Sequence, residues 1–150
     1  MPGCVCPHPP LLVPEIGRGS RDEVSATVSG MERLAAAVGE PQTAVIISPH
    51  TPTFYDVFGV KTAPILHGNF AAFGCPHVGK ELPNDVEFAQ TLLKAGPAAG
   101  LPIEPVSEDD LDHGVLVPLT FLKVRSLVSL SIVGGYAQHR ELGELVAEVA

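Results

Sequence analysis

The sequence has no tryptophan, few other aromatic residues and few basic ones. Aromatic residues make up 5% of the chain, which argues against an aromatic platform for single-stranded nucleic acid. Nine Lys and Arg residues stand against 17 Asp and Glu residues, for a net charge of −8. Because nucleic acids and anionic membranes attract clustered positive charge, the composition argues against both as partners.

The sequence also lacks long apolar runs and the cysteine pattern of a disulfide-bonded protein. No segment approaches the roughly 20 apolar residues of a membrane-spanning helix, and no secretory signal pattern is present. Three cysteines, an odd number, suit a reducing compartment, so we expect a cytoplasmic protein. The length of 150 residues and the hydrophobic content of 45% suffice for one domain with its own core.

Strand-like and helix-like segments alternate along the chain. A β-branched run, TAVIIS at 43–48, predicts a strand buried on both faces. The other expected strands are 3–7, 57–62 and 65–73 as a hairpin, 101–106 and 127–133. The expected helices are 21–38 with Ser20 as its cap, one that begins after Asn84, 115–124 and 138–150. This alternation indicates an α/β fold with a mainly parallel or mixed sheet flanked by helices.

The last expected helix stays amphipathic to Ala150, with no capping glycine and no strand after it. A helix in an α/β alternation is normally followed by the strand that it covers. We therefore expect residues 1–150 to be the N-terminal part of one larger domain.

Three of the six histidines share a setting: each follows a strand-like segment and stands beside proline or glycine. His8 lies in PHPP, His50 in SPHTP and His113 in LDHG. Loops that leave different strands of an open α/β sheet converge at one edge, so these histidines could meet. Neighbouring prolines limit their motion, and Gly114 allows close backbone approach. A single histidine of this kind is more often a hydrogen-bonded loop residue, and the residues alone leave the two interpretations balanced.

The other candidate ligands give weaker signals. Cys4 and Cys6 lack the two-residue spacer of zinc motifs and are interpreted as small buried hydrophobes. His67, His77 and His139 are expected at the surface without a role.

Acidic residues offer no convincing third ligand, although Asp112 could orient the neighbouring imidazole. We expect the acidic run 108–112 as a whole to be solvated. The acidic candidates are Glu15, Asp56, Glu81, Asp109, Asp110 and Asp112.

Several motifs in register resemble one known family. They are PHPPLLVPEIG, AVIISPHTP, FAAFGCP, ELPND and LDHGVLVPLTFL. In order and spacing they are similar to the catalytic B subunit of class III extradiol dioxygenases. The resemblance is closer to the dioxygenase-like domain of AmmeMemoRadiSam system proteins and their Memo-like relatives, and it covers essentially all 150 residues.

The resemblance implies roles for the three histidines. His8 and His50 match the two histidine ligands of a metal, Fe(II) in the family, although another divalent metal is possible. His113 matches the histidine of the DHG motif, which lines the pocket for the aromatic substrate and O2, and it is our catalytic candidate. The third ligand, a glutamate in the ring-cleaving enzymes, and a further catalytic histidine are expected downstream of Ala150.

Two functions follow from the resemblance. One is a non-haem Fe(II) extradiol-type dioxygenase that opens the ring of a catechol-like aromatic, with activity lost if the short chain lacks its third ligand. The alternative is a non-catalytic Memo-like module that binds a metal or a partner. A second copy or a downstream domain could supply the missing ligand. A metal-free α/β hydrolase is a distant third option, because the sequence has no G-x-S-x-G turn.

Overall fold

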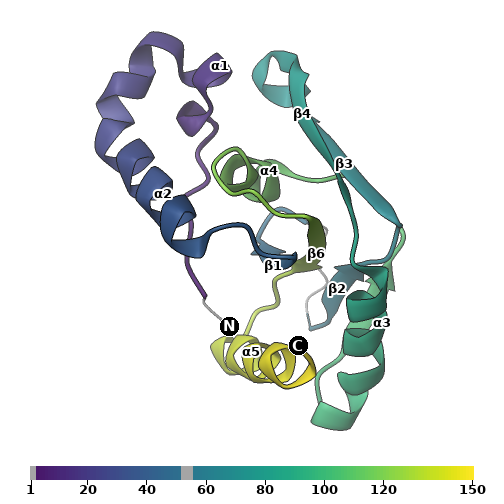
Figure 1. Cartoon of the computed structure of the whole chain (residues 1–150). Coiled ribbons are helices and arrows are strands. Elements are labelled where there is room, and N and C mark those ends of the chain that lie inside the picture. Colours follow the sequence, from purple (N-terminus) through teal and green to yellow (C-terminus); the bar gives the residue numbers. More distant parts are fainter. Residues whose placement is uncertain (1–2, 52–55) are drawn as a thin grey trace.

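The structure is a computed structural model that describes residues 3–51 and 56–150 (Figure 1). In chain order its elements, with η for short 3-10 helices, are η1 (Pro10–Leu12), α1 (Pro14–Gly17), η2 (Arg18–Val24), α2 (Ser25–Val38), β1 (Thr43–Ser48), β2 (Phe58–Lys61), β3 (Ile65–Phe70), η3 (Ala71–Phe73), β4 (Cys75–Pro83), α3 (Val86–Ala95), η4 (Pro97–Ala99), β5 (Ile103–Val106), α4 (His113–Leu119), β6 (Ser126–Ser131) and α5 (Tyr136–Val149).

A four-stranded sheet in the order β1-β6-β2-β5 forms the centre of the fold. β1 is parallel to β6 and β2 is parallel to β5, whereas β2 and β6 pair antiparallel. The predicted α/β class with a mixed sheet is confirmed. Because β1 and β6 run the same way, the loop after β1 leaves the sheet at its carboxyl edge, where His50 lies.

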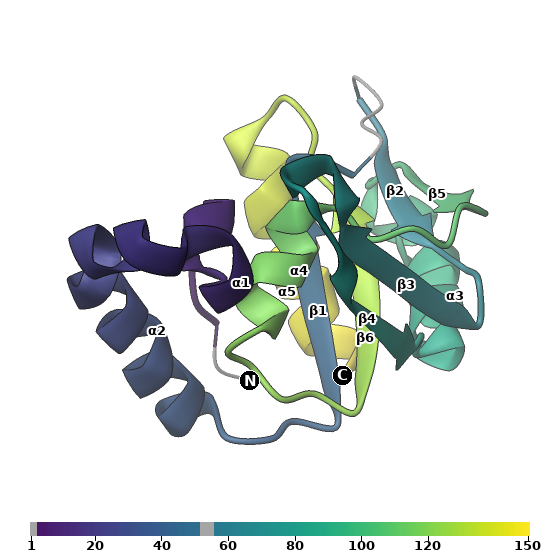
Figure 2. The same ribbon diagram turned by 90° about the horizontal axis from the view of Figure 1, so that it is seen from above.

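Two hydrophobic clusters cover the two faces of this sheet. Neighbouring residues of β6 face opposite ways: Leu127 packs into the cluster with α4 and the β3–β4 hairpin, and Val128 into the cluster with α3 and α5. Figure 2 shows α4 and α5 on opposite sides of β1 and β6. α4, which carries His113, is thus held against one face of the sheet by its own buried residues.

β1 forms as predicted, but its burial is less than predicted. Most of its residues are half-buried and Ile47 is 39% exposed, because β1 is an edge strand that pairs with β6 alone in the described chain. The strands buried along all or nearly all of their length are β2 and β6, which each have a neighbour on both sides.

The predicted hairpin of 57–62 with 65–73 is wrong. β2 joins the main sheet, and β3 instead pairs antiparallel with β4, a strand the sequence analysis missed. β4 carries two prolines and polar residues that mask a strand pattern. At Gly79 an added Cβ would collide with the Gly68 carbonyl across the hairpin, so a side chain there would disturb the pairing.

The predictions for the N-terminal region need two corrections. Residues 3–7 form no strand; they lack a partner strand, and Pro7 has no backbone donor. The helix expected at 21–38 is split into η2 and α2, and Ser20 makes no capping hydrogen bond.

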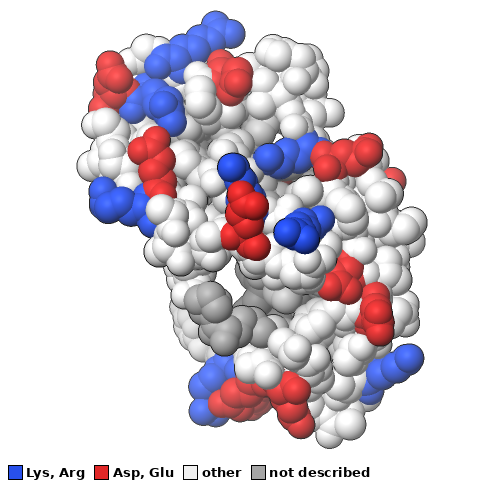
Figure 3. All heavy atoms as spheres, in the orientation of Figure 1, with Lys and Arg blue, Asp and Glu red and all other residues white. Residues whose placement is uncertain are grey.

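The other predicted elements are present, with ends shifted by a few residues. The strand at 101–106 is β5, the strand at 127–133 is β6, and the helices at 115–124 and 138–150 are α4 and α5. Among the described residues, no helix has both the length and the apolar character to cross a membrane. Figure 3 shows acidic and basic side chains interspersed on one face of the molecule, in line with the absence of a basic patch there.

Asp85 caps the predicted helix after Asn84, now α3, and links it to the sheet. Its Oδ1 accepts from the Phe88 N–H (3.1 Å) and its Oδ2 from the Thr43 hydroxyl (2.6 Å). We expect Asp85→Ala to lower the free energy of unfolding by about 1–3 kcal/mol, because the cap and the Thr43 bond are both lost. Asp85→Asn, which can still cap, should lose less. Urea unfolding of both variants measures this, and an unchanged midpoint for Asp85→Ala would contradict it.

Candidate metal centre

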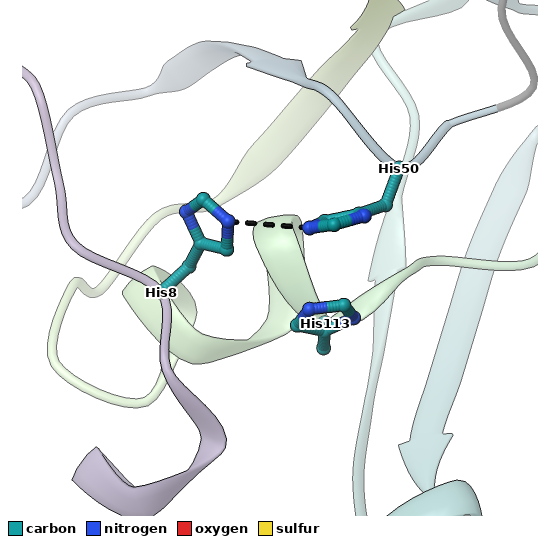
Figure 4. Close-up of side chains that lie close together, drawn as sticks. All are labelled: His8, His50 and His113. Atoms are coloured by element: carbon teal, nitrogen blue, oxygen red, sulfur yellow. Dashed lines mark hydrogen bonds between the residues drawn. The ribbon is translucent and has the colours of Figure 1, made fainter.

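Three histidines from distant parts of the chain meet at the carboxyl edge of β1 (Figure 4). His8 lies in the extended segment before η1, His50 two residues after β1, and His113 at the first position of α4. The Nε2 atoms of His8 and His50 are 3.2 Å apart. One nitrogen of each of the three imidazoles lies within 4.8 Å of the others.

The spacing of the His8 and His50 nitrogens suits two ligands of one metal ion. Imidazole nitrogens bind at about 2.0–2.1 Å, so two of them at an angle of about 100° on one ion lie about 3.2 Å apart. The observed 3.2 Å matches this separation. The ring of His113 lies 4.1 Å from that of His50 and 5.8 Å from that of His8, centroid to centroid. The donor set therefore fits a divalent transition metal.

Asp112 fixes the meeting point of β1 and α4. As the N-cap of α4, its Oδ1 accepts from the N–H groups of Gly114 (2.6 Å) and Val115 (3.3 Å). The Ser48 hydroxyl at the end of β1 also donates to Oδ1 (2.6 Å), and the Thr51 hydroxyl donates to Oδ2 (2.8 Å). One carboxylate thus ties the start of the helix that carries His113 to the strand end that precedes His50.

Gly114 allows α4 to approach that strand end. A Cβ at this position would overlap the Ser48 hydroxyl and would lie 2.8 Å from Asp112 Oδ1 and 3.2 Å from His50 Cδ2. Real Cβ contacts are essentially never below 3.0 Å, so any side chain would push apart the two elements that present the histidines. The glycine of LDHG is a packing requirement of the site, as the sequence analysis expected.

The His8 segment is anchored by the residues that follow it. The N–H groups of Leu12 and Val13 donate to the carbonyls of Pro9 and Pro10, which forms η1. Both side chains are fully buried in the cluster with α4. Prolines at 7, 9 and 10 remove backbone freedom around His8. An open cavity of about 630 Å³ lies beside it, lined by Val5, Cys6, Pro7, His8, Pro9, Pro10 and His113.

The pKa of His113 is lowered from its ordinary value. Burial is the main cause, followed by the positive charge that His50 would carry; Asp112 raises the pKa and His8 lowers it. The neutral imidazole is therefore the favoured form near pH 7, with a nitrogen lone pair available to a proton or a metal.

The paired thiols are not part of the three-histidine group. Cys4 is exposed and Cys6 half-buried, so the prediction of two buried residues is wrong; Cys75 is the buried cysteine. The Sγ atoms of Cys4 and Cys6 are 3.8 Å apart. Burial and the neighbouring Cys4 raise the pKa of the Cys6 thiol to about 11, which keeps it protonated and makes it a poor ligand or nucleophile at neutral pH.

The remaining histidines lie outside the group. His67 and His77 are exposed, as predicted, and His67 pairs with Asp109 at 3.6 Å. His139 is more buried than predicted: its Nδ1 lies 2.7 Å from the Gly135 carbonyl and its ring packs edge-on against Phe58.

The acidic run 108–112 has structural contacts that the sequence analysis did not foresee. The buried ammonium of Lys61 donates to the Glu108 carbonyl (3.1 Å) and to Asp110 Oδ1 (3.2 Å). Asp112 is the cap described above, so the expectation of a solvated run is wrong for these contacts. Among residues 3–51 and 56–150, no carboxylate joins the three imidazoles.

We expect Asp112→Ala to lower the free energy of unfolding by about 2–4 kcal/mol, because it removes the cap and leaves the buried Ser48 and Thr51 hydroxyls without their acceptor. The matched control is Asp109→Ala, which alters the exposed pair with His67 and should change stability by less than about 0.5 kcal/mol. Urea unfolding measures both. Equal effects of the two substitutions would contradict this role of Asp112.

The motifs and the fold agree with comparisons to known proteins. The chain is similar to Protein CA_C1420 of Clostridium acetobutylicum, with 30% identity over 127 residues, 77% of this chain and 27% of that protein. The chain thus spans well under two thirds of the length of this relative. Residues 2–149 match the family described as the catalytic LigB subunit of aromatic ring-opening dioxygenase. The chain therefore belongs to the family of the catalytic LigB subunit of aromatic ring-opening dioxygenases.

Proposed function

We propose that the chain is part of a non-haem Fe(II) dioxygenase of the extradiol type, which opens the ring of a catechol-like aromatic with O2. The single observation that carries this is the 3.2 Å separation of the His8 and His50 nitrogens, with His113 beside them. Membership of the aromatic ring-opening dioxygenase family supports the reaction class and a metal-dependent mechanism. The motifs favour the AmmeMemoRadiSam and Memo-like branch.

In this proposal His8 and His50 are the metal ligands. The bound metal would supply an open face on which a catechol and O2 can react together. The proline-anchored segment holds His8 in position, and the Asp112 network holds the strand end that precedes His50. These contacts set the two imidazoles before any ligand arrives, which reduces the entropy lost on binding.

His113 is the catalytic residue in this proposal. Its lowered pKa keeps a free nitrogen lone pair at neutral pH, and its ring faces the cavity beside His8. It can therefore accept the proton that a catechol hydroxyl loses as the substrate binds. The walls of that cavity are mainly proline and valine side chains, which suit a flat apolar ring.

A third protein ligand would come from outside the 150 residues. Among the described residues no carboxylate lies with the three imidazoles. We propose that residues 1–150 are the N-terminal part of a larger domain, whose later segment or a second copy supplies it. The greater length of the clostridial relative is compatible with this.

The second candidate function is a Memo-like module that binds a metal or a partner without turnover. The observation that favours it is the all-histidine donor set: since no carboxylate of the described residues belongs to the group, His113 could serve as the third ligand instead of a proton acceptor. These two roles of His113 can be separated by experiment.

Metal binding tests the ligand assignment. Titration with Co²⁺ or Zn²⁺, and with Fe²⁺ under anaerobic conditions, should show one site that His8→Ala or His50→Ala weakens at least about 10-fold. The matched control is His77→Ala, which alters an exposed residue of β4 and should bind normally. His113→Ala should keep most of the affinity; a loss as large as that of His8→Ala would make it a ligand and contradict its catalytic role. Unchanged binding in all variants would refute the site.

The same titration should depend on pH. Imidazoles bind metals only when neutral, and free histidine titrates near pH 6.5. The affinity should therefore fall as the pH is lowered, because protons compete with the metal for the imidazole nitrogens, by up to about 10-fold per pH unit for each proton displaced. An affinity that stays constant from pH 7 to about pH 5 would show that carboxylates, not histidines, hold the metal.

Ring opening tests the reaction. Iron-loaded full-length protein, with the later segment that the proposal requires, should form a yellow ring-opened product with oxygen and a panel of catechols, and its His8→Ala variant should form none. If full-length protein that retains iron through His8 and His50 gives no product with any catechol, the dioxygenase proposal fails and the binding module is favoured.

A further inference from the structure

The β3–β4 hairpin presents a phenylalanine to the histidine cluster. η3 connects the two strands, and Gly74, at φ +77°, turns the chain back into β4 in a conformation that favours glycine. Phe70 is fully buried, whereas Phe73 is 40% exposed at the hairpin tip. The ring of Phe73 lies 5.2 Å from that of His113 at an interplanar angle of 67°, an edge-to-face contact.

The position of this tip is fixed by the body of the protein. The Asn69 side chain accepts from the Ala71 N–H (2.9 Å), which starts the turn, and the Phe70 ring lies 6.3 Å from that of Phe73. β3 is also bonded to the segment before α4: the His67 N–H donates to the Asp109 carbonyl and the Leu111 N–H to the His67 carbonyl. The hairpin and the start of α4 therefore form one unit, and Phe73 meets His113 within it.

The His113 ring is held by packing and not by hydrogen bonds. Within residues 3–51 and 56–150, neither of its nitrogens makes a hydrogen bond, and both oxygens of the neighbouring Asp112 are already bonded to Ser48, Thr51 and the start of α4. The idea that Asp112 orients the imidazole is therefore not supported by its contacts. The rings that flank His113 are those of His50, at 4.1 Å, and Phe73, at 5.2 Å.

We propose that Phe73 is a positioning residue that holds the His113 imidazole toward His8 and His50. Edge-to-face contact directs the ring edge of one aromatic at the face of the other and so prefers a limited set of orientations. Phe73 contacts the His113 ring and does not line the cavity beside His8. The effect of Phe73 on catalysis rests on the proposed function, whereas its effect on the orientation of His113 does not.

Imidazole NMR tests the positioning directly in the metal-free chain. Protein with ¹³C-labelled histidine is compared as wild type, Phe73→Ala, Phe73→Tyr and Phe73→Leu, near pH 8 so that imidazoles are neutral. The His113 signals are assigned from their loss in His113→Gln. In Phe73→Ala they should shift and broaden as the ring contact is lost, Phe73→Tyr should restore the wild-type position, and Phe73→Leu should not.

The matched control is Phe121→Ala, which removes a half-buried ring beyond the other end of α4. It should leave the His113 signals in place even if it lowers stability. His113 signals that coincide in wild type and Phe73→Ala would overturn the proposal. Equal shifts of the His113 signals in Phe121→Ala would also overturn the proposal, because they would show that any loss of packing in the fold moves these signals.

A second measurement separates this inference from the proposed function. If the iron-loaded wild type opens catechols, Phe73→Ala should lower kcat about 10-fold or more with metal content unchanged and KM changed less, since only the orientation of His113 is lost. Unchanged kcat would overturn the positioning role in catalysis. An inactive full-length wild type would refute the proposed function, while the NMR result would still decide the contact between Phe73 and His113.

Discussion

The carboxylate of Asp112 is the interaction on which the site depends. Its two oxygens receive hydrogen bonds from the end of β1 and from the first turn of α4. Without that shared acceptor, the strand end before His50 and the helix start at His113 would be related only by the packing of α4 against the sheet, since β2 to β5 and α3 separate them in sequence. Gly114 makes the same junction sterically possible. The cap thus acts on the site through structure alone: its hydrogen bonds help to set the relative position of the His50 and His113 imidazoles.

The imidazole of His8 is held at the site by different contacts. His8 belongs to no strand or helix, and its segment is held by prolines and by the burial of Leu12 and Val13 against α4. Prolines reduce the freedom of the unfolded chain, so less entropy is lost when His8 is fixed. The same helix that presents His113 is therefore also the surface on which the His8 segment is anchored. α4 is the common support of all three histidines, since Asp112 at its start also fixes the strand end of His50.

Much of the fold and the meeting of the histidines could be predicted from the sequence. TAVIIS and LVSLSIV are rich in apolar and β-branched residues and form β1 and β6, as predicted. The three histidines do meet, but only His50 closely follows a strand, because the strand predicted before His8 does not form and His113 begins α4. The partner of β3 could not be predicted for two reasons. The proline and polar residues of β4 obscure its strand pattern, and strand pairing depends on tertiary contacts that the local sequence does not show. The role of Asp112 was equally hidden: an acidic run looks solvated until the fold places Ser48 and Thr51 against it. Phe73 had no signal beyond its family motif.

The close approach of His8 and His50 restricts where their ring nitrogens can carry protons. At 3.2 Å the two Nε2 atoms are within hydrogen-bond distance, so one carries a proton that the lone pair of the other accepts. If both Nε2 atoms carried a proton, neither could accept, and the hydrogen bond would be lost. A divalent metal bound here would need the Nε2 lone pair of both rings. The proton on the donating Nε2 would then move to Nδ1 of the same ring, so each imidazole stays neutral and offers one lone pair at the spacing of metal ligands.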